Sequence, residues 1–120
     1  MNIHGAEREI EMYIGSPSEK IREAKIARSV IDLAGRSMED ALQPINAKSE
    51  EQRNFAGDVR LHAIAQIWSE EIDPTYQDAQ MAQALLAACN CHLEARFWLD
   101  NKDGQFIALL ENDIEKALGE

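Results

Sequence analysis

The sequence predicts an all-α protein, a compact antiparallel bundle of five to six helices formed by one domain spanning residues 1–120. Three observations indicate this fold. No segment alternates polar and apolar residues with the period of two that is typical of a half-buried strand. Helix-capping patterns recur along the chain, and the segments between them carry apolar residues three and four positions apart. The connections are short, so successive helices are expected to pack antiparallel.

The first predicted helix is short and ends at Gly15. Its apolar face consists of Ile3, Ile10 and Ile14. Ser16, Pro17 and Glu19 then form a capping box with a proline in the first turn, so a second helix is expected to begin there. Gly35 suits the left-handed position that closes a helix. Residues 18–43 are therefore expected to form either two helices or one helix with a kink at Gly35.

Two further helical segments are expected before residue 74. Ser37 opens a short one that Pro44 stops, and residues 44–48 form a loop. Ser49 and Gln52 mark another capping box, which begins a longer helix. Its apolar stripe includes Phe55, Val59, Ala63 and Ile67. Gly57 stands alone inside this helix, where a glycine more often indicates close packing than the approach of a ligand.

Asp73 and Pro74 repeat the cap-and-proline pattern and are expected to begin a long, largely buried central helix over residues 74–100. Within it, Ala79–Leu93 is fifteen residues long, carries no charge and has eleven apolar side chains. A helix that is apolar on most sides needs neighbours around it. Because the flanking helices are short, a second copy of the chain is expected to cover part of it, which favours a homodimer; cover by the same chain is the alternative.

The chain closes with a turn at Asn101–Gly104 and an amphipathic helix from Phe106 to Leu118, ended by Gly119. Its N-terminal stretch is acidic and lacks the basic start and apolar run of a secretory signal. No window reaches the length of a membrane span. Cys89 and Cys91 are two residues apart, which on a helix turns them away from each other, so reduced thiols and a cytoplasmic location are expected.

Charge is distributed unevenly in this chain of net charge −10. Residues 1–60 carry nine basic and eleven acidic side chains, whereas residues 61–120 carry three basic and eleven acidic ones. The second half should repel nucleic acid and anionic membranes. Its charge suits a basic protein partner, including one that binds nucleic acid; the alternative is that the acidity only keeps the protein soluble. The candidate contact residues for such a partner are Asp58, Glu70, Glu71, Asp73, Asp78 and Glu94.

A metal site would have to involve Cys89 and His92, which are three residues apart and would face the same way on a continuous helix. Two ligands do not make a site, and the others would have to come from His62, His4 or Glu94. The favoured interpretation is that Cys89 is a small core residue and that His92 has one hydrogen-bond partner inside the bundle. No metal or cofactor is therefore expected.

The sequence contains no residue pattern that is typical of an enzyme active site. The doublets Glu50-Glu51 and Glu70-Glu71 lack an acid or histidine three residues later, and there is no serine elbow or glycine-rich phosphate loop. Basic residues between positions 20 and 36 alternate with acids, which argues against direct DNA binding. The sequence thus favours a non-catalytic protein that acts by protein–protein interaction, such as an inhibitor, an antitoxin-like or anti-defence modulator, or a phage or mobile-element accessory protein. The alternative is a metal-binding bundle or enzyme that uses Cys89, His92 and His62.

Overall fold

The computed structural model describes residues 17–119, so the first predicted helix lies outside the described residues. Over this range the chain is all-α, as predicted. The α-helices are α2 (Pro17–Leu33), α3 (Met38–Ala41), α4 (Glu50–Gln66), α5 (Ala79–Cys89), α6 (Ala95–Asp100) and α7 (Phe106–Ala117). A π-helical turn, η1 (Ile67–Glu71), extends α4, and a short 3-10 turn, η2 (Pro74–Tyr76), follows it.

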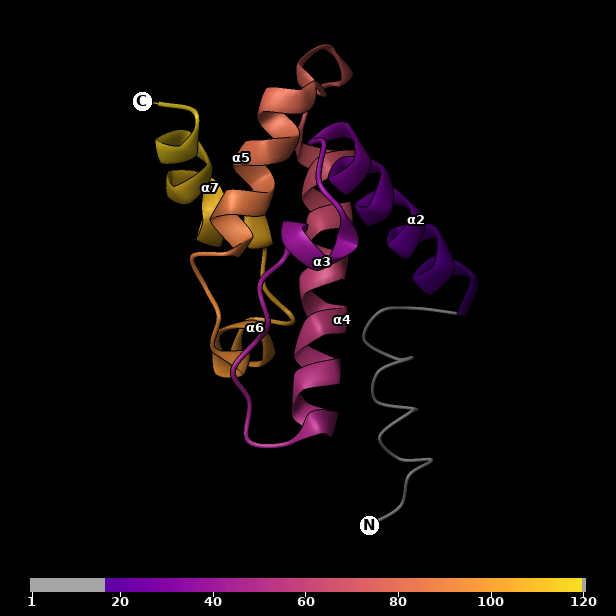
Figure 1. Cartoon of the computed structure of the whole chain (residues 1–120), viewed down its shortest axis with the longest axis vertical. Coiled ribbons are helices and arrows are strands. Elements are labelled where there is room, and N and C mark those ends of the chain that lie inside the picture. The colour runs from indigo at the N-terminus through magenta and orange to yellow at the C-terminus, as the bar shows by residue number, and fades with distance from the viewer. Residues whose placement is uncertain (1–16, 120) are drawn as a thin grey trace.

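The helices pack around α4 and α5, as Figure 1 shows. α2 lies along one side of α4, and α6 packs against α4 on another side. α5 packs mainly against α7 and also contacts α2. In the same view the segment between α3 and α4 descends from the middle of the molecule to its lower end, where α4 begins.

Most helix ends lie where the capping residues predict them. α2 begins at Pro17, and Gly35 after it has a φ of 74°, the left-handed conformation that glycine adopts without strain. The Ser37 side chain accepts a hydrogen bond from the Asp40 backbone N–H at 3.2 Å. The Ser49 side chain does the same for Gln52 at 3.1 Å. These local signals are therefore sufficient to define α2, α3 and the start of α4.

The predicted continuous helix over residues 74–100 is wrong. Asp73 does accept a hydrogen bond from the Thr75 N–H at 2.8 Å, but the turn that follows, η2, lasts three residues. α5 begins only at Ala79, after a second cap in which the Asp78 side chain accepts from the Met81 N–H at 2.9 Å. It ends at Cys89, and α6 is a separate six-residue helix.

The break between α5 and α6 is stabilised by the segment that precedes α4. The Gln43 N–H donates to Asn90 Oδ1 at 2.9 Å, and Asn90 Nδ2 donates to the Ala41 carbonyl at 2.9 Å. The Asn46 backbone then forms a short parallel bridge with Glu94, donating its N–H to the Leu93 carbonyl at 2.7 Å. Polar groups that would otherwise continue the helix are thus satisfied by residues far away in the sequence.

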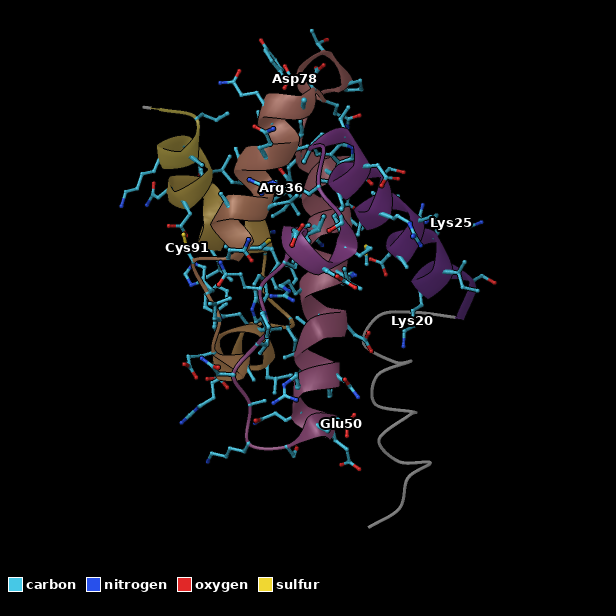
Figure 2. The ribbon with its side chains drawn as sticks, viewed as in Figure 1. Lys20, Lys25, Arg36, Glu50, Asp78 and Cys91 are labelled. Carbon is cyan, nitrogen blue, oxygen red and sulfur yellow. The ribbon has the colours of Figure 1, made fainter. Side chains whose placement is uncertain are left out.

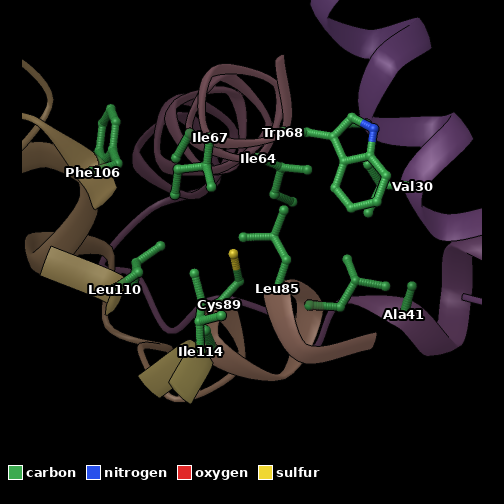
Figure 3. Packing of buried hydrophobic residues seen from close by; sticks show 14 of the residues in the cluster. Val30, Ala41, Ile64, Ile67, Trp68, Leu85, Cys89, Phe106, Leu110 and Ile114 are labelled. Atoms are coloured by element: carbon green, nitrogen blue, oxygen red, sulfur yellow. The ribbon is translucent and has the colours of Figure 1, made fainter. Parts of the chain in front are cut away.

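The core forms where α4, α5 and α7 meet, with α2 and α6 closing it (Figure 3). In this view Leu85 and Cys89 of α5 lie between Ile64 of α4 and Ile114 of α7. Six of the eleven residues of α5 are buried, namely Ala82, Ala84, Leu85, Leu86, Ala88 and Cys89. Helices of the same chain therefore bury much of the α5 surface that a second copy was expected to cover. The homodimer stays a prediction.

Within residues 17–119, no helix combines the length and the apolar character needed to cross a membrane.

Candidate binding surfaces

Four of the six acidic residues predicted to contact a partner come together at one end of the molecule. Glu70, Glu71, Asp73 and Asp78 lie in or beside the connection between α4 and α5, and all four are exposed. We call residues 70–78 the acidic loop; Figure 2 labels Asp78 at this end, opposite Glu50. The sequence has no lysine or arginine between Arg60 and Arg96, so no basic residue of this region offsets the acids.

Tyr76 projects from the acidic loop. Its side chain is 63% exposed, more than any other large hydrophobic side chain among the described residues. The loop around it is held in place, because Gln77 Nε2 donates to the carbonyls of Trp68 at 2.8 Å and Ile72 at 3.2 Å. Trp68 and Ile72 are themselves buried. An exposed aromatic ring is thus presented on an ordered turn between carboxylates.

The carboxylates of Glu70 and Glu71 have no hydrogen bond or ion pair with any other described residue, and both residues are exposed. Asp73 and Asp78 cap helical turns. The hydrogen bonds from Thr75 hold the pKa of Asp73 below its ordinary value, so this carboxylate is charged at neutral pH.

The other two predicted contact residues lie elsewhere. Asp58 is on α4, where its carboxylate forms an ion pair with Lys20 of α2 at 3.3 Å. Glu94 is in the turn before α6 and accepts a hydrogen bond from Asn46 Nδ2 at 3.3 Å. Neither belongs to the acidic loop, and both carboxylates already have a partner.

Cys89 and His92 do not share a helix face as a metal site would require, because α5 ends at Cys89 and His92 lies in the turn that follows. His92 Nε2 lies 2.8 Å from Asp113 Oδ2 of α7, and its ring stacks on Phe97 with centroids 3.9 Å apart. Cys89 is fully buried, and burial raises the pKa of its thiol to about 12. Cys89 therefore has the environment of a core residue.

His62 has a different set of neighbours. Its Nδ1 is within hydrogen-bonding distance of Glu23 Oε2 of α2, and its ring meets Phe106 edge-on with centroids 6.0 Å apart. Among residues 17–119 there is no group of three or more histidine, cysteine, aspartate or glutamate side chains that could hold a metal ion. The structure thus gives no support to a metal site built from Cys89, His92 and His62.

A groove of about 400 Å³, which we call the α4 groove, lies between α4 and the segment 38–45. It is lined by Met38, Leu42, Pro44, Ile45, Arg53, Asn54, Gly57, Asp58, Arg60 and Leu61. Both arginines of α4 donate hydrogen bonds to backbone carbonyls of the segment 38–45. Arg53 Nε donates to the Ile45 carbonyl at 3.1 Å, and Arg60 Nη1 donates to the Gln43 carbonyl at 2.8 Å. Sequence reasoning did not identify this site.

Two signals in the sequence could have indicated the groove. Arg60 is four residues after Ala56 and four before Ile64, so it occupies the buried stripe of α4, which is an unusual place for a charge. Gly57 is the other signal. The close packing expected there is wrong, because a Cβ atom built at Gly57 would meet nothing within 4 Å.

Comparison of the chain with known protein families, with curated proteins and with solved structures gave no match.

Proposed function

We propose that this protein acts without catalysis, by binding a basic protein through the acidic loop. The observation that carries the proposal is the exposure of Tyr76 between four carboxylates on an ordered turn. Aromatic side chains are enriched among the residues that contribute most to protein–protein binding, and the surrounding charges speed association and select partners. The two features together suit a surface with a small apolar pocket surrounded by lysines and arginines.

The partner class that fits best is a protein that binds nucleic acid, since its basic surface normally faces phosphates. An acidic protein that covers such a surface competes with the nucleic acid, which is how an inhibitor, an antitoxin-like protein or an anti-defence modulator works. A phage or mobile-element accessory protein would act in the same way. We place this activity in the cytoplasm, where the two free thiols Cys89 and Cys91 would remain reduced.

Affinity purification of the full-length tagged protein from native lysate tests the proposal with a matched pair of variants. Glu70→Gln with Glu71→Gln removes two charges from the acidic loop, and Glu50→Gln with Glu51→Gln removes two at the opposite end of the molecule. We expect the wild type and the Glu50/Glu51 variant to retain a basic protein that added salt releases. The Glu70/Glu71 variant should lose it. Equal retention by both variants would contradict the proposal.

A further inference from the structure

The α4 groove contains a buried positive charge without a counter-ion. Arg60 is only 8% exposed, and its Nε atom is buried with no hydrogen-bond partner. Burial lowers the pKa of its guanidinium group, and no carboxylate of a described residue acts against that effect. A buried charge normally has an ionic partner, because removing it from water without one is costly. The single carbonyl bond to Gln43 therefore leaves this arginine incompletely satisfied.

Gly57 lines the α4 groove, and it has no side chain that would occupy the groove. A glycine inside a helix lowers helix stability relative to alanine, so it needs a reason to be there. Neither crowding nor a left-handed backbone supplies one, since a Cβ atom would meet nothing within 4 Å and the φ angle is not positive. Gly57 therefore leaves open space beside α4, in the wall of the groove.

The walls of the groove define what could enter. Its apolar side chains come from Met38, Leu42, Pro44, Ile45 and Leu61. Met38 is 48% exposed. The one carboxylate among the lining residues, Asp58, is paired with Lys20 at 3.3 Å. The groove thus presents two anchored arginines beside an apolar wall.

We propose that the α4 groove binds a segment of a protein partner that carries a carboxylate next to an apolar side chain. The carboxylate would lie beside the guanidinium groups of Arg53 and Arg60, which both line the groove, and the apolar side chain would lie along Leu42 and Ile45. A nucleic acid is the less suitable occupant, because a chain of net charge −10 repels a polyanion. This site is distinct from the acidic loop and goes beyond the proposed function.

The test is an NMR titration of the full-length ¹⁵N-labelled protein with the dipeptide N-acetyl-Leu-Glu-amide. We expect saturable shifts of the Arg60 Nε–Hε signal and the Gly57 amide signal. N-acetyl-Leu-Lys-amide and inorganic phosphate should cause neither. Equal shifts with the acidic and basic dipeptides, or no shift with the acidic one, would overturn the proposal; saturation by phosphate alone would assign the groove to a phosphate ligand instead and would also overturn it.

Variants separate binding in the groove from a structural role of Arg60. Gly57→Leu fills the floor with a residue that favours a helix, so the protein should stay folded and bind the dipeptide about tenfold more weakly or worse. Arg60→Met should do the same if it folds. Arg96→Met, which changes an exposed arginine on α6, should bind like the wild type. The Glu70/Glu71 variant should also bind normally, so the two proposals fail independently. Unchanged binding by Gly57→Leu would contradict the site.

Discussion

At the residue scale, the chain depends on a few side chains that connect distant segments. Asn90 is the clearest case, because it uses both its donor and its acceptor on the segment 41–43 and so holds the end of α5. Arg53 and Arg60 of α4 bind carbonyl groups of the same segment. Irregular backbone between α3 and α4 is thus stabilised by side chains, as buried backbone polar groups require.

Asn90→Ala removes two of these hydrogen bonds. We expect it to lower the free energy of unfolding by about 1–3 kcal/mol, because the Gln43 N–H and the partly buried Ala41 carbonyl lose their partners. Asn90→Asp keeps the acceptor for Gln43 but places a carboxylate oxygen against the Ala41 carbonyl, so it should also lower the free energy of unfolding. Asn54→Ala, at an exposed position, is the control. Urea unfolding followed by circular dichroism measures the difference; an Asn90→Ala midpoint equal to that of the wild type would show that the bridge is dispensable.

The two cysteines should differ in reactivity although they are two residues apart. Cys91 is exposed, whereas Cys89 is fully buried and its thiol has a pKa of about 12. Only the thiolate reacts, so Cys89 should stay unmodified at pH 7 and still at pH 9, since both lie well below its pKa. Ellman's reagent is expected to modify one thiol in the native protein and two in denaturant. Fast modification of both native thiols would disagree with the core position of Cys89.

At the element scale, helix ends were predictable wherever the signal is local. Gly35, Ser37 and Ser49 act within four residues of the helix end that each defines, so the sequence alone identifies them. The break after α5 could not be predicted in this way. The groups that satisfy Asn90 are 47 and 49 residues away, and nothing in the run Ala79–Leu93 indicates their approach.

Gly57 allows a direct comparison of the two interpretations of a mid-helix glycine. Because a Cβ atom there meets nothing, Gly57→Ala should raise the free energy of unfolding by about 0.5–1 kcal/mol. Close packing would instead make the same change destabilising. Gly35→Ala is the matched control: the position is equally open but has a φ of 74°, so we expect a loss of about 1 kcal/mol. Thermal and urea unfolding of both variants measure whether each substitution raises or lowers the free energy of unfolding.

At the scale of the whole molecule, the charge pattern of the sequence predicted only part of the candidate sites. Residues 70–78 are consecutive in the sequence, so their acidic side chains lie near one another in any fold. Asp58 and Glu94 were grouped with them on charge alone, and the fold places them in separate ion pairs or hydrogen bonds. The α4 groove depends on the contact between α4 and the segment 38–45, which no local pattern reveals.

The homodimer remains a prediction about the assembled state. The homodimer was expected because a second copy would cover the uncharged run Ala79–Leu93. One chain already buries six residues of α5 in this run. Among residues 17–119, the large apolar side chains that stay exposed outside the acidic loop are Ile21, Leu33 and Met38. A homodimer would give the mass of two chains at micromolar concentration in sedimentation equilibrium. A monomer mass throughout a dilution series would contradict it and leave self-burial as the complete explanation.

The central claim is that the acidic loop is the surface that meets a basic protein partner. Site-specific photo-crosslinking in native cells tests it most directly, with p-benzoylphenylalanine in place of Tyr76 or, as the control at the opposite end, in place of Glu50. We expect a discrete crosslinked product from position 76 that contains one basic protein, and none from position 50. The product should disappear when Glu70 and Glu71 are changed to Gln. No product at position 76, or the same products from both positions, would contradict the claim.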